Sequence, residues 1–529
     1  MTNDPAPTAP SAASPPAAGA VELGTTPPTA DEVVAVARHG ASVSLTGEAR
    51  EALAVGRRHV EALAGRATPV YGVSTGFGAL ADRHIPTDLR TKLQRSLIRS
   101  HAAGSGPSVE REVVRAMMLL RLRTLTTGRT GVRPVVAETF AALLNAGPTP
   151  VVHEHGSLGC SGDLAPLASV ALVLMGEGEV DDAAGVRRPA AEALTEAGIE
   201  PVTLAEKEGL ALINGTDGML GMLLLALADL DRSLQVADIA AAMSIESQLG
   251  SDRVLADELQ RLRPHPGQAA SAANLRALLA DSPIVASHQG PDCSLVQDAY
   301  SLRCAPQVAG AVRDTVDHAR LVADRELAST IDNPVVTEDG EVSSNGNFHG
   351  APVGYVCDFL AVAVADLASI AERRIDRALD ATRSRGLPHF LADDPGVDSG
   401  LMIAQYTAAG IVSELKRLAT PASVDSIPSS GMQEDHVSMG WSAARELRRA
   451  VDGLTEVLAI EVMTAARALD LRAPLTPSPA TAAVLEVLRE HVPGPGPDRH
   501  LAPEIAATVE LVRSGALVAA AGSVTGPLR

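Results

Sequence analysis

From Ala205 to residue 471, the sequence consists largely of long stretches in which leucine, alanine, methionine and isoleucine recur at three- and four-residue spacing. This spacing places the apolar side chains on one face of a helix. Helices of this length must pack on one another, so the pattern predicts a mostly α-helical fold with a long-helix bundle at its core. The stretches are Asp217–Gln248, Ala269–Leu279, Tyr300–Ser329, Val353–Ala381, 399–419 and 437–471.

Composition agrees with a helical fold. Aromatic residues make up only 2% of the chain, whereas sheet-rich proteins rely on aromatic and β-branched residues. Ordered structure is expected to begin at Thr29-Ala30-Asp31-Glu32, an N-cap-like start for a helix over Val33–Arg38, followed by a helical stretch over Glu48–Gly65. The predicted segments are a disordered Pro/Ala-rich tail (1–28), a loop-rich N-terminal domain (29–204), the helix bundle (205–472) and a C-terminal helical cap (473–529).

The charge balance argues against nucleic acid and membrane partners. The chain has 44 Lys+Arg and 64 Asp+Glu, a net charge of −20, which repels phosphate backbones and anionic lipids. Its most apolar stretch, Met219–Ala228, is far shorter than the roughly 18 residues that span a bilayer. The N-terminus also lacks the basic and apolar regions of a secretory signal. We therefore expect neither a nucleic-acid partner nor a membrane span.

Cysteine usage points to a reducing compartment. The cysteines are scattered and form no C-x-x-C pair, which argues against a disulfide framework and a thiolate zinc site. We therefore expect a cytoplasmic protein. The four residues are Cys160, Cys293, Cys304 and Cys357.

His153-Glu154-His155 resembles a metal-binding pair. Its histidines lie two apart on a segment bounded by proline, without the i, i+4 geometry of a helical pair and without an obvious third ligand nearby. We therefore predict a solvated loop here and no metal site.

Gly72-Val73-Ser74-Thr75-Gly76 matches the G-x-S-x-G nucleophile elbow, which would make Ser74 the nucleophile of an α/β-hydrolase. An elbow needs a preceding strand and a following apolar helix. Here Phe77-Gly78 continues the loop and no parallel-sheet pattern surrounds it. The hydrolase remains a minor alternative.

The segment Gly159-Cys160-Ser161-Gly162-Asp163 contains a tripeptide that can cyclise. The amide nitrogen of Gly162 would attack the carbonyl carbon of Cys160, an approach that a Cβ at position 162 would hinder. Loss of water closes the ring, and removal of the Ser161 hydroxyl as a second water leaves an exocyclic methylene. The product is a methylidene-imidazolone electrophile, and the side chain of residue 160 stays outside the ring. An ordinary glycine turn is the simpler interpretation of the tripeptide alone.

The tripeptide does not stand alone. The sequence closely resembles the aromatic amino acid ammonia-lyases, and within them the enzymes that act on histidine. The resemblance implies an ammonia-lyase/fumarase-like fold in a homotetramer with active sites shared between subunits. It also implies a 4-methylidene-imidazol-5-one group formed autocatalytically from Cys160-Ser161-Gly162, with no external cofactor. The matching strings are YGVSTGFG, RSHAAGSG, GSLGCSGDLAPLA, KEGLALINGT, VQDAYSLRC, TIDNPVV, NGNFHG, DSGLMIAQYTAA and QEDHVSMG.

Elimination of ammonia from an α-amino acid requires an electrophile and a positioned base, because the amine leaves poorly and the β-hydrogen is barely acidic. The resemblance assigns the electrophile to the methylene at Ser161 and the base to Tyr71, with Tyr300 as the second candidate. A tyrosine fixed beside glycine turns fits an active-site group. The plainer alternative for Tyr71 is a loop tyrosine that packs by its ring.

The resemblance also implies residues that bind the substrate. Arg303 matches the arginine that captures the substrate carboxylate. Three-residue spacing puts Gln297 and Tyr300 near the same face as Arg303, if this segment is helical. Asn214 matches an asparagine that hydrogen-bonds near the prosthetic group and substrate, and Phe348 matches a residue that packs over both. The plainer alternatives are a surface arginine, an Asn-Gly turn and core burial.

Two positions predict the substrate. His101 stands where the histidine-specific enzymes carry histidine, and Glu434 stands where the phenylalanine-type enzymes lack a glutamate. A carboxylate accepts the N–H groups of an imidazole ring, whereas a phenyl ring would leave it unpaired at a cost of about 1–3 kcal/mol. The resemblance therefore implies L-histidine as substrate, with trans-urocanate and ammonia as products, in the first step of histidine degradation.

The sequence departs from the family pattern at Cys160, Ser169, Ala299 and Gly431, where the commoner residues are Ala, His, Pro and Ala. None of these changes removes a predicted catalytic group. Two alternatives remain open besides the hydrolase: a related aromatic amino acid lyase or aminomutase, and a catalytically silent paralogue that serves as a helical scaffold.

Overall fold

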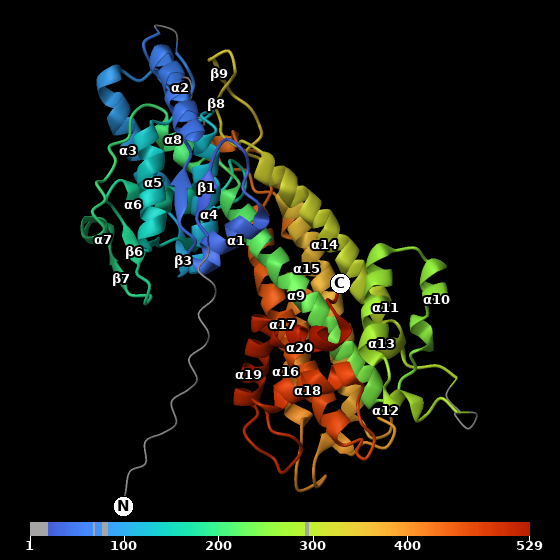
Figure 1. Ribbon diagram of the computed structural model, residues 1–529. Helices are drawn as coiled ribbons and strands as arrows, with labels where there is room; N and C mark the ends of the chain where they lie inside the picture. The colour runs from blue at the N-terminus through green and yellow to red at the C-terminus, as the bar shows by residue number, and fades with distance from the viewer. Residues whose placement is uncertain (1–18, 67–68, 77–82, 291–295) are drawn as a thin grey trace, which may run out of the picture. The chain divides into compact units, whose positions relative to one another are not determined.

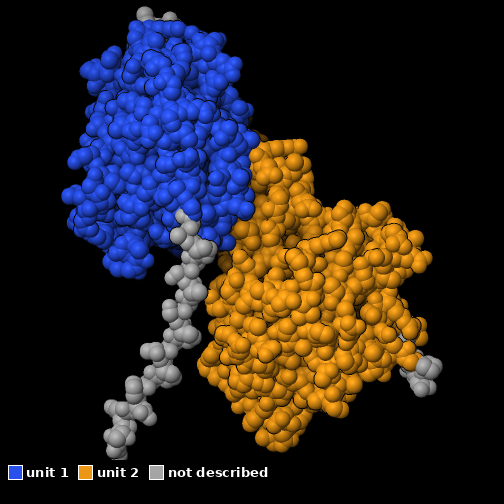
Figure 2. Space-filling view, in the orientation of Figure 1, with its two compact units in different colours: residues 1–157, 161–221, 327–348 blue, residues 158–160, 222–326, 349–529 orange. Residues whose placement is uncertain are grey.

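A computed structural model describes residues 19–66, 69–76, 83–290 and 296–529. The chain forms two compact units, each assembled from separate stretches of sequence (Figure 2). Unit 1 comprises Met1–Ser157, Ser161–Gly221 and Leu327–Phe348, and unit 2 comprises Leu158–Cys160, Met222–Glu326 and His349–Arg529. These units do not follow the contiguous segments predicted from the sequence, because one boundary falls inside a long helix and another inside the cyclisable tripeptide.

Unit 1 combines short helices with small sheets (Figure 1). Its helices are α1 (Ala30–His39), α2 (Gly47–Ala64), α3 (Arg90–His101), α4 (Arg111–Thr126), α5 (Pro134–Ala146), α6 (Leu164–Leu174), α7 (Ala190–Glu196) and α8 (Glu208–Ile213). Its strands are β1 (Val21–Leu23), β2 (Val43–Leu45), β3 (Ser105–Ser108), β4 (Thr149–Pro150), β5 (His153–His155), β6 (Glu179–Asp181), β7 (Arg187–Pro189), β8 (Val335–Val336) and β9 (Val342–Ser343). The sheets are β1-β2, which is parallel, and the antiparallel β3-β5, β4-β6-β7 and β8-β9.

The start of unit 1 confirms one prediction and corrects another. Thr29 caps α1 in a capping box, in which its side chain accepts from the backbone of Glu32 and the Glu32 carboxylate accepts from the backbone of Thr29. The disordered tail was predicted to reach residue 28, yet Val21–Leu23 is a strand paired in register with Val43–Leu45. Its apolar side chains are buried, so tertiary pairing orders a segment that composition alone assigns to the tail. Residues 1–18 lie outside the described residues.

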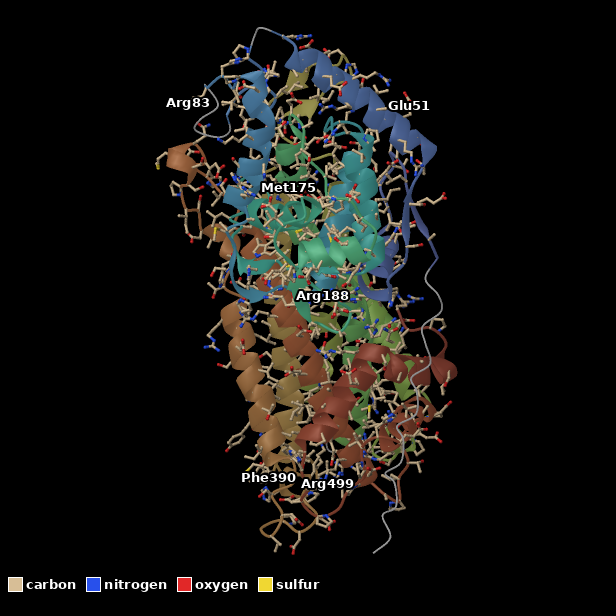
Figure 3. The ribbon with its side chains drawn as sticks, turned by 90° about the vertical axis from the view of Figure 1, so that its left-hand side faces the viewer. Glu51, Arg83, Met175, Arg188, Phe390 and Arg499 are labelled. Carbon is tan, nitrogen blue, oxygen red and sulfur yellow. The ribbon has the colours of Figure 1, made fainter. Side chains whose placement is uncertain are left out.

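The core of unit 1 contains α4, which is buried along most of its length. The apolar helix α6 is also largely buried and ends beside Met175, which is labelled in Figure 3. A second apolar cluster joins Val60 of α2, Val73 and Val336 of β8. Because Val73 follows Tyr71 by two residues, this cluster anchors the turn that carries Tyr71.

Unit 2 is built from long helices, as the periodicity predicts. Helices α15 and α17 pack along each other most extensively, and α16 packs on both. The helices are α9 (Asp217–Ser247, whose first residues belong to unit 1), α10 (Asp257–Arg261), α11 (Pro266–Leu279), α12 (Pro283–Ala286), α13 (Tyr300–Arg303), α14 (Ala305–Ala328, whose end belongs to unit 1), α15 (Ala351–Leu379), α16 (Met402–Leu418), α17 (Gly440–Asp470), α18 (Pro479–Arg489), α19 (Ala502–Ser514) and α20 (Ala516–Thr525).

By length and composition alone, α15 is apolar enough to cross a membrane, and so is the bent pair α19–α20 if it is taken as one span. In α15, 61% of the apolar window is buried inside the structure. Core helices of helical bundles have the same length and composition, so this feature is weak support for a span.

Candidate active site

The second half of the cyclisable tripeptide lies in unit 1, where its backbone is tightly enclosed. Gly162 has a φ of 76° and forms a β-bridge with Gly215. A Cβ on Gly162 would lie 2.1 Å from the carbonyl oxygen of Gly215, so only glycine fits. The amide of Asp163 donates to that same oxygen at 2.7 Å. The backbone therefore has the bent, side-chain-free geometry that the cyclisation requires.

Asp163 ties the tripeptide to the first turn of α9. Its carboxylate is buried and accepts from the backbone amides of Gly218 and Met219 at 2.9 and 3.0 Å and from the Ser157 hydroxyl at 2.9 Å. Burial raises the pKa of Asp163 to about 7, against the opposing effect of these hydrogen bonds. Amides at a helix N-terminus favour a carboxylate, and they fix the segment that follows Gly162.

Asn214 lies directly before the glycine that pairs with the tripeptide. Asn214 is buried, and among the described residues its side-chain Oδ1 has no hydrogen-bond partner. The wholly buried Arg121 donates to the backbone oxygens of Asn214 and Ile331 at 2.6 and 2.7 Å. A buried amide oxygen with unused accepting capacity fits a group that accepts a hydrogen bond from a polar ligand.

Tyr71 occupies a turn that is held from both sides. Gly72 has a φ of 72°, and a Cβ there would meet the ring of Pro334 at 2.9 Å. The Ser74 hydroxyl accepts from the Val70 amide at 2.9 Å. Ser74 is also buried, and in the described stretch 69–76 it lies in a turn that follows no strand. The hydrolase alternative is therefore wrong, while Tyr71 itself is half-buried on an ordered turn. Phe77-Gly78 lies outside the described residues.

The remaining candidates of unit 1 are His101 and Phe348. His101 is the last residue of α3, and its Nδ1 lies 2.9 Å from the carbonyl oxygen of Leu97. A carbonyl can only accept, so Nδ1 carries the proton and the lone pair of the neutral ring lies on Nε2. Phe348 is half-buried just before α15. Gly162 of the tripeptide is bonded directly to the Asn214 segment. His101 and Phe348 belong to the same unit as Gly162.

Unit 2 contains the first half of the tripeptide together with Glu434. The carbonyl oxygen of Gly159 accepts from the Ser438 hydroxyl at 2.9 Å and from the Gly350 amide at 3.3 Å. The Cys160 thiol donates to Oε2 of Glu434 at 3.1 Å. The carboxylate predicted to select the substrate therefore lies against the first residue of the tripeptide.

Glu434 closes a short, strained loop. The Ser429 hydroxyl donates to its Oε2 at 2.9 Å, and the Ser429 amide donates to its backbone oxygen at 2.9 Å. Between them, Ser430, Gly431 and Met432 have φ values of 50°, 62° and 71°. Left-handed conformations are costly for residues other than glycine and cluster at functional sites, so the loop is consistent with a functional role for Glu434.

Gln297, Tyr300 and Arg303 come together, although not on one helix as predicted. Helix α13 begins only at Tyr300, and Cys304 separates it from α14. Gln297 precedes this helix, so the prediction that it shares a helical face with Tyr300 and Arg303 is wrong. Nevertheless, Arg303 donates to Oε1 of Gln297 at 2.6 Å, and its guanidinium lies 4.8 Å from the Tyr300 ring centroid. Tyr300 is 69% exposed, so the trio forms a surface cluster on unit 2.

The histidine pair of His153-Glu154-His155 is not a loop. These residues form β5, which pairs antiparallel with β3. The sequence favoured a loop because proline precedes the segment, but strand pairing with residues far away in sequence decides its structure. Within the described ranges, no group of His, Cys, Asp and Glu side chains could hold a metal ion.

Comparison with known proteins gives the same assignment as the motifs. The family model for aromatic amino acid lyases matches residues 29–490. The chain belongs to this family.

Among the relatives of this lyase, the histidine ammonia-lyase of Streptomyces coelicolor is 67% identical over 510 residues, covering 96% of this chain and 99% of the relative. The solved tyrosine aminomutase of Streptomyces globisporus superposes with a TM-score of 0.91 at 39% identity, covering 96% of this chain and all of the other. The solved histidine ammonia-lyase of Trypanosoma cruzi gives 0.87 at 37% identity, covering 95% of each chain. The predicted mostly α-helical ammonia-lyase fold is thus confirmed.

Two features of this lyase were missed by sequence reasoning. His349 and His436 stack with ring centroids 5.6 Å apart and an interplanar angle of 5°. Both histidines lie in family strings, QEDHVSMG and NGNFHG, in which the sequence assigned a role only to Glu434 and Phe348. Arg121 lies in a helix whose apolar pattern gives no sign that it joins two loop segments. The signal for His349 was its position in the family string NGNFHG.

The departure at Ser169 has a simple explanation in this lyase. Its hydroxyl donates to the carbonyl oxygen of Ala165 at 3.1 Å, one turn earlier in α6. Such back-bonding is common for serine in helices. The hydroxyl therefore bonds to its own helix.

Proposed function

We propose that this chain is a histidine ammonia-lyase, which eliminates ammonia from L-histidine to give trans-urocanate in the first step of histidine degradation. The observation that carries the proposal is the 3.1 Å contact between Cys160 and Glu434, which puts a carboxylate beside the tripeptide. A carboxylate there accepts the N–H groups of an imidazole and disfavours a phenyl ring. The Streptomyces coelicolor relative, at 67% identity, is named histidine ammonia-lyase.

We propose that Cys160-Ser161-Gly162 forms the 4-methylidene-imidazol-5-one group, with no external cofactor. Support comes from the enclosed glycine at 162 and from hydrogen bonds on both flanks, at Gly159 and Asp163. The group supplies an electrophile to the substrate. The chain itself contributes the Asn214 amide, which is buried and has an unused acceptor.

The other residues take the roles that the resemblance assigns. Arg303 binds the substrate carboxylate and is oriented by Gln297. Tyr71 takes the β-proton, with Tyr300 as the second candidate for this role. His101, whose Nδ1 donates to the Leu97 carbonyl, binds the substrate, and Phe348 packs over the bound ring.

The proposed assembly is a homotetramer with shared active sites. Tyr300 lies on the surface beside Arg303, where a neighbouring subunit could use both. Apolar side chains also project from α15 and α16, and exposed apolar patches of this kind mark interfaces. They are Tyr355, Phe359, Val362, Ile403 and Tyr406, which are between 47% and 62% exposed.

We also propose a cytoplasmic location with no nucleic-acid or membrane partner. The net charge of −20 supports the absence of such partners. Among the residues that the structure describes, Cys160, Cys304 and Cys357 form no disulfide, which suits a reducing compartment.

The test is an assay of purified protein with L-histidine, L-phenylalanine and L-tyrosine, beside a Ser161→Ala control. Urocanate is followed by absorbance and ammonia by release, while intact mass shows whether the chain has lost two waters. Urocanate from L-histidine alone, absent in the control, is the expected result. A β-amino acid product would indicate an aminomutase. A full-mass chain, inactive on every substrate, would indicate the silent scaffold.

A further inference from the structure

Position 160 carries a side chain whose function the cyclisation chemistry leaves open. Only the carbonyl of residue 160 enters the ring, and the commoner residue there is alanine. In this chain Cys160 is 8% exposed, and its thiol donates to Oε2 of Glu434 at 3.1 Å. Both residues belong to unit 2, so the contact lies within one compact part of the molecule.

Glu434 needs support of this kind. Its loop passes through consecutive left-handed residues, Ser430 to Met432, and the chain on either side is tied together by backbone hydrogen bonds between Ser429 and Glu434. These bonds fix the backbone but not the carboxylate. The carboxylate is oriented by donors to its Oε2, which include the Ser429 hydroxyl at 2.9 Å and the Cys160 thiol.

The two donors differ in what they connect. Ser429 lies on the same loop as Glu434, so its hydrogen bond moves with the loop. Cys160 belongs to the tripeptide, whose preceding carbonyl is bonded to Ser438 and Gly350. The thiol therefore sets the position of the carboxylate relative to the tripeptide, and a methyl group at 160 has no hydrogen to donate.

We propose that the Cys160 side chain is a positioning residue for recognition of the imidazole ring, acting through its hydrogen bond to Glu434. The inference rests on the proposed function, because it takes the imidazole of L-histidine as the partner of Glu434. It predicts that the Cys160→Ala enzyme still forms its prosthetic group, since the ring does not include the side chain, but binds L-histidine less well. The expected rise in KM is about two- to tenfold, which corresponds to one hydrogen bond.

The experiment compares wild type with Cys160→Ala and Cys160→Ser. Intact mass establishes whether each variant has lost two waters. Steady-state kinetics then separate KM from kcat for L-histidine, and inhibition by L-phenylalanine reports binding of an aromatic substrate without ring N–H groups. We expect a higher KM for Cys160→Ala with kcat changed less, recovery in Cys160→Ser because a hydroxyl donates, and unchanged inhibition by L-phenylalanine.

Two further arms separate positioning from general damage. Calorimetric titration of L-histidine into Ser161→Ala, with and without Cys160→Ala, measures binding without turnover and should show the same loss. In a Glu434→Gln background, Cys160→Ala should have little additional effect, because the interaction is already altered. Cys357→Ala removes a buried thiol from the second turn of α15 and serves as the matched control with unchanged KM.

Several outcomes would overturn the inference. They are an unchanged KM and calorimetric affinity in Cys160→Ala, an equal loss for L-histidine and L-phenylalanine, and full additivity with Glu434→Gln. Absence of urocanate in the wild-type protein would instead reject the proposed function, so the two failures are distinguishable.

Discussion

The segment of unit 1 proposed to form the prosthetic group and the segments of unit 2 proposed to bind the substrate are supported in different ways. In unit 1, the chain around Gly162 is fixed by buried polar groups, including the Asp163 carboxylate and the guanidinium of Arg121. In unit 2, Tyr300 and Gln297 lie on an exposed segment, and Glu434 lies on a short loop. Backbone cyclisation tolerates little displacement, whereas the substrate-binding side chains need fixing only once the site is complete. The chain therefore fixes the segment around Gly162 more fully than the proposed binding groups of unit 2.

A methyl group at position 162 should have the largest effect. In Gly162→Ala the new Cβ would lie 2.1 Å from the Gly215 oxygen, and the backbone has a φ of 76°. We expect no loss of two waters in the intact mass and activity reduced by about a thousandfold or more, because the electrophile is missing.

Gly185 provides the matched control for this substitution. Its φ is 79°, yet nothing lies within 4 Å of the position that a methyl group would occupy there. Gly185→Ala has the same conformational cost without the collision, so it should retain both the mass change and the activity. Equal damage in both variants would mean that conformational strain, rather than the contact with Gly215, makes glycine necessary at 162.

The buried ion pair of unit 1 should show the next largest effect. Nζ of Lys207 lies 2.5 Å from Oδ2 of Asp332, and both side chains are fully buried. Asp332 precedes the Asn333-Pro334 segment that contacts the Tyr71 turn. Lys207→Met leaves a buried carboxylate without its cation, so we expect a loss of about 3–5 kcal/mol in the free energy of unfolding.

An exposed pair measures how much of that loss is due to burial. Arg66 and Glu341 form a hydrogen-bonded pair at 2.8 Å with about half of each side chain exposed. Arg66→Met should leave the free energy of unfolding almost unchanged, because solvent screens an exposed pair. Thermal and denaturant unfolding of both variants makes the comparison, and similar losses would remove the distinction between buried and exposed support.

The sequence predicted the long helices well, because their apolar periodicity extends over many turns. It failed where distant segments decide the structure. Val21–Leu23 is ordered by pairing with β2, and His153–His155 by pairing with β3. The break at Cys304 interrupts a segment whose periodicity continues unchanged.

The candidate site shows the same limit. Motifs identified the tripeptide and the residues around it, but not how they are held. The β-bridge of Gly162 to Gly215, and the left-handed Ser430 and Met432 before Glu434, depend on tertiary contacts. Neither serine nor methionine favours the left-handed conformation by itself, so no local sequence pattern predicts it.

Glu434→Gln tests one of the proposed substrate-binding groups of unit 2. An amide oxygen accepts an imidazole N–H more weakly than a carboxylate does, so kcat/KM for L-histidine should fall by about 10- to 100-fold, or about 1–3 kcal/mol. The intact mass should still show the loss of two waters, since this side chain is not part of the ring. If Glu434→Gln kept both waters, the Glu434 side chain would be shown to affect the cyclisation of the tripeptide.

The last expected effect is a pH dependence of stability that originates at Asp163. Burial raises its pKa to about 7 in the folded chain, whereas an aspartate in an unfolded chain titrates near about 3.9. The folded chain therefore retains a proton that the unfolded chain has lost between about pH 4 and 7. The stabilisation from this group is present below the lower value and is lost as the pH rises through the higher one. Asp163→Asn removes the titration, so the wild-type unfolding temperature should decline relative to the variant from about pH 5 to pH 8.

Asp380 supplies the opposite case for the same measurement. Hydrogen bonds from Thr382 and Arg383 lower its pKa to about 2, so its stabilisation is complete above the unfolded value of about 3.9 and is lost only in stronger acid. Between pH 5 and 8, the difference between wild type and Asp380→Asn should therefore stay constant. A constant difference for Asp163→Asn as well would mean that its carboxyl is already ionised at pH 5. The amides of α9 would then outweigh burial, and the segment after Gly162 would be held by a full negative charge at the helix N-terminus.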